Sequence, residues 1–190
     1  MKQPLIETLN VTNFSTPIGD MVIGATSRGL RLLEFVEKGR LDHKLAGISQ
    51  RMGCAILPGE TAITRQCARE LREYFAGKRR EFSLKLDLQG TAFQRSVWDA
   101  LCRIPFGQTR SYMEQAVSIR KPSAVRAVAN ANGANPVAII VPCHRVIGAN
   151  GTLTGYGGGL WRKQWLLQLE RGEKPTARDS VLSPATPASE

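Results

Sequence analysis

The segment TLNVTNFSTPIGDMVIGATSRGLRLLEFV, residues 8–36, decides the fold of the first half of the chain. It contains three runs rich in β-branched and aliphatic residues, which are separated by the turn-rich stretches STPIGD and SRG. Short β-prone runs interrupted by glycine, proline and serine are typical of antiparallel strands joined by tight turns. We therefore expect the chain to begin with an antiparallel meander.

An amphipathic helix is predicted over residues 61–77, where TAITRQCARELREYFAG repeats apolar residues every four positions and ends at a glycine. This spacing turns Cys67 toward the core. The following segment EFSLKLDLQG, residues 81–90, alternates apolar and polar residues and predicts a last strand. We place a linker at residues 89–90, after an amino-terminal α/β module at residues 1–88.

The second half of the chain is helical at its beginning. FQRSVWDALCRI, residues 93–104, places Phe93, Val97, Leu101 and Ile104 on one face, with Cys102 beside them as expected buried filler. A final helix is expected over residues 160–170, LWRKQWLLQLE, ending at Gly172. The remainder, residues 173–190, has the composition of a disordered tail.

Two short helices with a tight connection are predicted between these elements. In SYMEQAVSI, residues 111–119, Ser111 and Glu114 form a capping-box pattern. SAVRAVANANG, residues 123–133, is expected to open at Ser123 and to surround a single Arg126 with alanines. The pair fits a helix-turn-helix, although such pairs are often plain packing, and the small side chains allow close approach to another surface.

Composition limits the class of protein. A chain of 190 residues with 42% apolar residues has enough for one domain or two small ones. Its four cysteines have unrelated spacings, there is no apolar signal core, and no apolar run approaches the roughly 20 residues of a membrane helix. We expect a soluble, cytoplasmic protein with no membrane partner.

The positive charge is concentrated in the second half. Residues 89–172 contain 10 basic and 3 acidic residues, a local charge of +7 within a chain total of +10. This bias fits a polyanionic partner such as nucleic acid, and it also fits a solvated basic surface. Charge alone leaves both interpretations open.

The segment NPVAIIVPCHRVIGANG, residues 135–151, places a cysteine directly before a histidine. The apolar run at residues 137–141 predicts a buried strand, which Pro142 should end because proline has no amide hydrogen. Cys143 could be packing, a zinc ligand or a nucleophile. A neighbouring imidazole, Arg145 and free backbone amides would favour a thiolate. Zinc needs about four ligands at local spacing, and no further cysteine or histidine lies near Cys143 and His144 in the sequence.

These residues give the chain a close resemblance to the O6-alkylguanine-DNA alkyltransferases, also called methylated-DNA-protein-cysteine methyltransferases. The resemblance spans most of residues 8–172 and rests on PCHRV at 142–146, supported in order by RAV at 126–128, NP at 135–136, GYGGGL at 155–160 and WLLQLE at 165–170. It implies an α/β fold class: an amino-terminal module resembling ribonuclease H, then a mostly helical, winged helix-turn-helix-like module at residues 91–172.

The resemblance also implies the chemistry. Cys143 would be the alkyl acceptor, His144 would act through a water on the thiol, and Glu170 would orient the imidazole. Asn135 would be the hinge residue that braces the two halves of the site. The thioether product offers water no carbonyl to attack, so transfer would be stoichiometric and suicidal.

Substrate recognition follows from the same resemblance. Double-stranded DNA containing alkylated guanine would be the partner, and the nucleotide would be flipped out through the minor groove. Arg126 would fill the vacated stack and Tyr112 would aid rotation and protonate the leaving guanine, although Tyr112 alone could equally be a core aromatic. Docking would involve Ser123, Ala124 and Ala127, and the pocket wall would comprise Val146, Tyr156, Gly157 and Gly158.

Some relatives have an amino-terminal zinc site, which Cys54, Cys67 and His43 do not reproduce, so we expect no metal and no cofactor. We expect a monomer, and cooperative binding on DNA stays open. Two other classes remain: a cysteine hydrolase would also use Cys143 and His144 but would turn over, and a helix-turn-helix regulator would use the basic surface but leave the thiol without a role.

Overall fold

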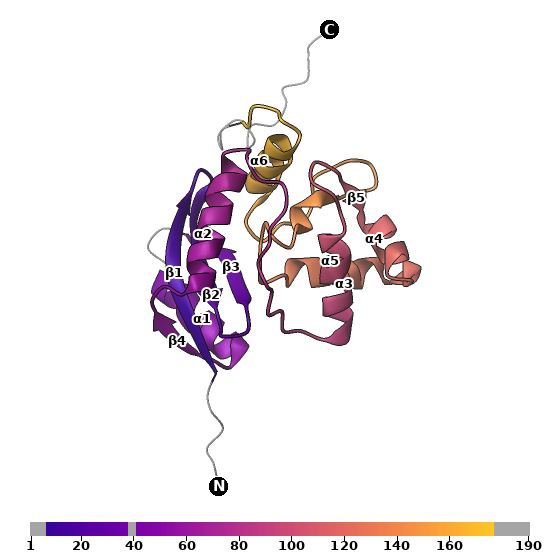
Figure 1. The fold of residues 1–190 in the computed structure, drawn as a ribbon. Coiled ribbons are helices and arrows are strands. Elements are labelled where there is room, and N and C mark those ends of the chain that lie inside the picture. Colours follow the sequence, from indigo (N-terminus) through magenta and orange to yellow (C-terminus); the bar gives the residue numbers. More distant parts are fainter. Residues whose placement is uncertain (1–6, 38–40, 177–190) are drawn as a thin grey trace.

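The computed structural model describes residues 7–37 and 41–176. Its first half contains the predicted meander, and the second half is mostly helical (Figure 1). The meander prediction is confirmed: three antiparallel strands follow one another, β1 (Thr8–Thr16), β2 (Gly19–Ala25) and β3 (Leu30–Phe35). The β1–β2 turn is tight, and its glycine, Gly19, has a positive φ of 113°.

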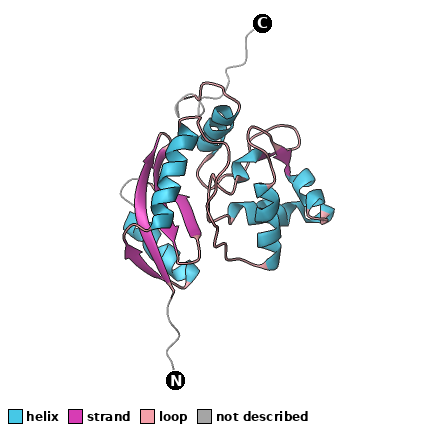
Figure 2. Ribbon diagram, viewed as in Figure 1, coloured by secondary structure: helices cyan, strands magenta, loops and turns pink. Residues whose placement is uncertain are grey.

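A fourth strand, which the sequence did not reveal, completes the sheet. α1 (Leu41–Met52) leads into β4 (Ala55–Pro58), which pairs parallel with β1 and gives the order β3-β2-β1-β4. α2 (Ala62–Phe75) is the predicted amphipathic helix, capped at Thr61. Figure 2 shows helices on the sheet half as well as the helical half.

Both faces of the sheet are covered, which explains why β2 and β3 are buried almost without alternation. Val22 and Leu32 pack with α1, whereas Met21 and Leu33 belong to the main core with Cys67 of α2. The prediction that Cys67 faces a core is therefore confirmed. This main core continues into the second half of the chain through Trp98, Val137 and Leu166.

The strand predicted over residues 81–90 is absent from the described segment. Only Leu86 forms an isolated bridge, with Leu30, supported by backbone hydrogen bonds from Leu30 N to Lys85 O and from Asp87 N to Leu30 O, both 2.8 Å. In this segment Leu84, Leu86 and Leu88 alternate with polar residues because the leucines pack against the core while the chain crosses to the second half. The alternation therefore reflects burial on one side of an extended segment, residues 81–90, and we call this whole segment the linker between the two halves.

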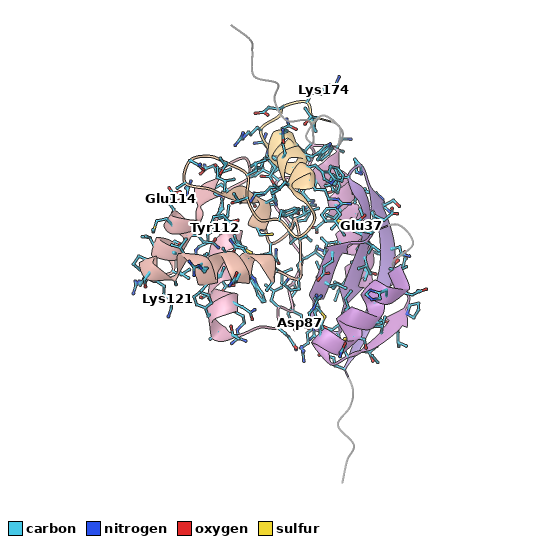
Figure 3. All side chains as sticks on the ribbon, turned by 180° about the vertical axis from the view of Figure 1, so that it is seen from behind. Glu37, Asp87, Tyr112, Glu114, Lys121 and Lys174 are labelled. Atoms are coloured by element: carbon cyan, nitrogen blue, oxygen red, sulfur yellow. The ribbon has the colours of Figure 1, made fainter. Side chains whose placement is uncertain are left out.

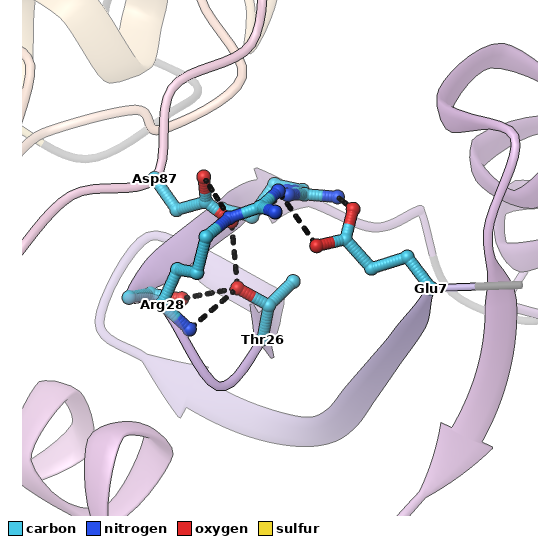
Figure 4. A network of polar contacts seen from close by, with 6 residues as sticks. Glu7, Thr26, Arg28 and Asp87 are labelled. Carbon is cyan, nitrogen blue, oxygen red and sulfur yellow. Dashed lines mark hydrogen bonds and ion pairs between the residues drawn. The ribbon is translucent and has the colours of Figure 1, made fainter. Parts of the chain in front are cut away.

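An ion-pair network fixes this linker to the sheet (Figure 4). The buried guanidinium of Arg31 contacts Glu7 on one side and Asp87 Oδ2, at 2.5 Å, on the other. Asp87 also accepts hydrogen bonds from Thr26 Oγ1 at 2.6 Å and Arg28 Nε at 3.2 Å. We call these five residues, Glu7, Thr26, Arg28, Arg31 and Asp87, the linker network.

The second half packs three helices together before the candidate site. Gln115 and Asn132 exchange buried side-chain hydrogen bonds of 3.1 and 2.7 Å, and Trp98 Nε1 donates to Ala131 O at 2.8 Å. The elements are α3 (Ala92–Cys102), β5 (Arg110–Ser111), α4 (Tyr112–Ser118), the 3-10 turn η1 (Pro122–Ala124), α5 (Val125–Gly133), the 3-10 turn η2 (Cys143–Arg145), β6 (Val146–Ile147) and α6 (Leu160–Glu170).

Three local predictions need correction. Ser123 does not cap α5, because it lies inside η1, where Pro122 occupies the first turn and no side chain caps the helix. Cys102 is exposed and not buried filler, since it is the last residue of α3 and lies off the buried face. The tail begins in an ordered way, with Thr176 N donating to Gln168 Oε1 at 3.0 Å, and residues 177–190 lie outside the described residues.

The buried run at residues 137–141 is not a strand. Val137 forms one parallel bridge with Leu33, after which the chain turns and Ile139 adopts a positive φ of 71°. The hydrophobic run predicted burial correctly but not conformation, because a short apolar run has the same composition in a strand and in a buried turn. The bridge joins the candidate site to β3.

None of the helices within the described ranges combines the length and hydrophobicity of a membrane-crossing helix.

Candidate active site

Cys143 opens the η2 turn, directly after the buried turn that contacts β3. Asn135 braces it: its side-chain Nδ2 donates to Val141 O at 2.7 Å and to Cys143 Sγ at 3.3 Å, while Oδ1 accepts from Val137 N at 3.0 Å. One amide side chain therefore links the backbone on both sides of the turn to the sulfur atom.

His144 and Glu170 form a buried pair beneath the cysteine. The exposed fractions of the two residues are 0% and 5%, and His144 Nε2 lies 2.8 Å from Glu170 Oε1. Glu170 also accepts from Tyr74 OH at 2.8 Å, from Gly107 N at 3.1 Å and from two nitrogens of Arg145 at 2.8 and 2.9 Å. We call His144, Arg145, Tyr74 and Glu170 the acceptor network.

Glu170 is ionised in this network. Burial opposes ionisation, but the hydrogen bond from His144 and the hydrogen bonds and positive charge of Arg145 outweigh it and hold the pKa of Glu170 well below its usual range. A carboxylate can only accept hydrogen bonds, so the proton between the two side chains belongs to His144 Nε2. The network also explains an acid at the carboxyl end of α6, where the helix dipole alone would disfavour it.

His144 is a neutral base with one nitrogen unengaged. Burial, only partly offset by Glu170, lowers the pKa of His144 below its usual value, so the imidazole is uncharged at neutral pH. With Nε2 protonated, Nδ1 carries the lone pair, and it has no hydrogen-bond partner among the described residues. The ring is thereby set up to accept a proton.

The Cys143 thiol is not a preformed thiolate. Burial raises its pKa, against the opposing effects of the Asn135 hydrogen bond and the charge of Lys163. The sequence-based expectation that Arg145 supplies this charge is wrong, because Arg145 is turned toward Glu170. Lys163, fully buried, lies close enough to act on the sulfur instead, and burial lowers its own pKa to about 8.

Lys163 also holds the segment GANGTLTGYGGG before α6, residues 148–159, which we call the glycine-rich loop. Its Nζ donates to Val146 O and to Thr154 O, both at 2.6 Å. Tyr112 OH donates to the same Thr154 carbonyl at 3.1 Å, and a Cβ at Gly155 would lie 3.2 Å from the Tyr112 hydroxyl. The loop before α6 is therefore tied down beside Tyr112 by residues from two other elements.

A cavity of about 220 Å³ opens at the cysteine. Five residues singled out from the sequence line it: Asn135, Cys143, Tyr156, Gly157 and Gly158. Val146 is buried and does not line it; its carbonyl receives Lys163 instead. A larger cavity of about 560 Å³ lies on the linker side, where Pro142 and Arg145 line it but Cys143 does not.

The predicted DNA-contacting residues gather at the start of α5, away from the buried networks. Ser123, Arg126 and Ala127 are exposed and Ala124 is half-buried. Figure 3 shows Tyr112 on the same helical half, with Glu114 and Lys121, opposite Glu37 of the sheet half. The structure thus separates an exposed basic helix end from the buried acceptor network.

Two residues of the site are not predicted from the sequence. Tyr74 is buried in α2 and reaches Glu170 across 96 positions of the chain, which no local pattern reveals. Lys163 lies in the basic start of α6, WRK, where a lysine is ordinarily solvated; a charged residue between two tryptophans was the available signal. Within the described ranges, no group of three or more histidine, cysteine or acidic residues could hold a metal ion.

Comparisons with known proteins agree on one family. Residues 92–172 match the model of the 6-O-methylguanine DNA methyltransferase DNA-binding domain, and residues 10–88 match that of the ribonuclease-like domain of the same proteins. The methylated-DNA–protein-cysteine methyltransferase of Methanosarcina barkeri is 48% identical over 156 residues, which cover 82% of this chain and 92% of that protein.

Solved structures give the same result. The structure of Mycobacterium tuberculosis OGT in complex with DNA superposes with a TM-score of 0.73 at 44% identity, covering 88% of this chain and 95% of that one. The O6-methylguanine-DNA methyltransferase of Pyrococcus kodakaraensis gives a TM-score of 0.62 at 25% identity, covering 85% and 98%. By fold, by sequence and by the cysteine set into this pocket, the chain belongs to the 6-O-methylguanine DNA methyltransferase family.

Proposed function

We propose that this protein repairs double-stranded DNA by moving the alkyl group of O6-alkylguanine onto Cys143, once per molecule. The observation that carries the proposal is a set of contacts around the cysteine that opens into the cavity. Asn135 Nδ2 donates a hydrogen bond to Cys143 Sγ, and the buried Glu170 carboxylate orients the neutral His144 ring. The relatives that share this fold are named for methylated DNA and a protein cysteine, which supports the same assignment.

The transfer is a displacement at carbon in which protons and electrons balance. His144 Nδ1, through a water, removes the thiol proton, and the sulfur electron pair forms the new S–C bond. The O6–C bond breaks, its electron pair returns to the guanine, and the base then takes up one proton. The products are a thioether on Cys143 and an unmodified guanine.

A protonated resting thiol suits this scheme. Because burial raises the pKa of Cys143, the thiol keeps its proton until a base removes it. Asn135 and the Lys163 charge stabilise the thiolate once it forms, since both lower the pKa of Cys143 against the effect of burial. A reducing compartment such as the cytoplasm keeps the thiol free.

Access to O6 requires the nucleotide to leave the duplex, at a cost of about a few kcal/mol. We assign the exposed Arg126 to the vacated stack, with Ala124, Ala127 and Ser123 allowing close approach to the minor groove. We assign to Tyr112, whose hydroxyl is bonded to Thr154 O of the glycine-rich loop, the steering of the rotated base and the donation of a proton to it, and to the Gly157 main chain a hydrogen bond to the leaving guanine. The local charge of +7 attracts the phosphates, and a monomer suffices.

Mass spectrometry of the intact protein after incubation with an O6-methylguanine duplex tests the proposal. We expect one added methyl group, located on the peptide containing Cys143, in the native protein and equally in Cys102→Ser, which removes an exposed thiol as a control. A hydrolase would release product and keep its mass, and a DNA-binding regulator would stay unmodified; either result would exclude alkyl transfer.

A further inference from the structure

The cavity at Cys143 is built by both halves of the chain. Besides residues of the second half, it is lined by three residues of the first half, namely Glu34 and Phe35 at the end of β3 and Arg51 of α1. Glu34 and Arg51 are joined by an ion pair of 2.6 Å, so they form a polar edge. Phe35 is the apolar member of this wall.

The Phe35 ring packs directly on the glycine-rich loop. A Cβ at Gly158 would lie 2.8 Å from Phe35 Cδ2 and 2.9 Å from Tyr156 Cε1, closer than side-chain carbons approach one another. Position 158 is therefore restricted to glycine while Phe35 and Tyr156 keep their places. Both rings therefore lie close to Gly158, and all three residues line the cavity that Cys143 opens into.

The Phe35 ring also contacts Arg162 of α6. The guanidinium carbon lies 4.5 Å from the centre of the Phe35 ring and 4.6 Å from that of Trp161. Arg162 is itself 7% exposed and held by hydrogen bonds to Ile18 O at 2.7 Å and Gly158 O at 2.6 Å. Phe35 is thus packed against both the loop and a buried arginine that is hydrogen-bonded to the loop, which restricts its movement.

We propose that Phe35 is a specificity-determining residue that limits the size of the O6 substituent the protein accepts. The inference rests on the proposed alkyl transfer: the transferred carbon must reach Cys143 Sγ, so its remaining atoms share the cavity with the Phe35 ring. In a close-packed cavity, small changes of volume alter selectivity strongly. Methyl groups fit beside the ring, whereas a benzyl group competes with it for space.

The test is a competition between two duplexes, one with O6-methylguanine and one with O6-benzylguanine, mixed with limiting protein. Mass spectrometry counts methylated and benzylated Cys143. Because both substrates draw on the same folded molecules, the product ratio is independent of any loss of stability. Phe35→Ala should raise the benzyl-to-methyl ratio about tenfold over the native protein, and the milder Phe35→Leu should give a smaller rise in the same direction.

Phe14→Ala is the matched control. Phe14 of β1 and Phe35 of β3 are both strand partners of Met21 in the sheet, one on each side of β2. Phe14, however, does not line the cavity. We expect its product ratio to equal that of the native protein. An unchanged ratio in both Phe35 variants, or an equal rise in Phe14→Ala, would overturn the size-limiting role. Failure of the native protein to alkylate Cys143 at all would instead overturn the proposed function.

Discussion

The molecule contains two ion-pair networks around buried charged side chains, and each has one buried side-chain nitrogen without a partner among the described residues. In the linker network the nitrogen is Arg31 Nε, and in the acceptor network it is His144 Nδ1. A guanidinium nitrogen keeps its proton at any accessible pH, whereas a neutral imidazole nitrogen can accept one. A buried, unpartnered nitrogen therefore belongs to a structural contact in the linker network and is a proton acceptor in the acceptor network.

The comparison also separates the two carboxylates. Hydrogen bonds and nearby arginines lower the pKa of both Asp87 and Glu170 despite burial. Asp87 fixes the linker between the two halves (Figure 4), while Glu170 fixes a ring beside the reactive sulfur. We expect changes in the first network to alter stability and changes in the second to alter chemistry.

Glu170→Gln should have the largest effect on chemistry. An amide presents an N–H as well as an oxygen, so the His144 tautomer is no longer fixed, and related triads lose about two to four orders of magnitude in rate from such a change. Single-turnover kinetics with an O6-methylguanine duplex would measure it. A rate within a factor of about two of the native protein would show that Glu170 does not orient the base.

Arg31→Met should affect stability and spare the chemistry. It leaves Glu7 and Asp87 without their buried partner, which typically costs about 3–5 kcal/mol. Urea unfolding measures the loss, and the transfer rate of the folded fraction should stay native. Arg28→Ala, at a side chain 53% exposed, is the control and should cost less than about 1 kcal/mol. A slowed transfer step in Arg31→Met would erase the distinction between the networks.

Lys163→Met should slow transfer by about tenfold at neutral pH, equivalent to about one pKa unit on Cys143. The methionine keeps much of the buried stem but removes the charge that favours the thiolate. Raising the pH should restore part of the rate, because more thiol ionises. Rate measurements between pH 6 and 9 would show the shift; a uniform loss at every pH would assign Lys163 to loop packing alone.

The smallest expected effect is the pH dependence of stability between pH 7 and 5. The folded-state pKa of His144 is depressed, so the unfolded chain takes up a proton near pH 6.5 that the folded chain refuses, and stability falls as the pH drops through this value. Glu170 and Asp87 have lowered pKa values, so their contribution is lost only further down, from about pH 4.

His144→Gln should flatten the decline between pH 7 and 5, and Arg31→Met should leave it intact. Urea midpoints at three pH values for the two variants would measure this. A decline of native size in His144→Gln would move the titrating group elsewhere.

The sequence predicts those features that depend on residues close together in the chain. Cys143 and His144 are adjacent, α2 and α4 carry their caps, and the meander has its turns between its strands. What it missed depends on distance: Tyr74 and Gly107 meet Glu170 only in the folded chain. The runs at 81–90 and 137–141 were assigned as strands because burial, and not backbone pairing, sets their hydrophobic pattern.

The most direct measurement is a titration of repair with excess O6-methylguanine duplex, following guanine restored and methyl groups on the protein. The thioether on Cys143 gives water no carbonyl to attack, so the thiol is not regenerated. We predict that repair stops at one equivalent per molecule, with the methyl group on Cys143. Repair that continues beyond one equivalent, or a methyl group on another residue, would contradict Cys143 as a single-use acceptor.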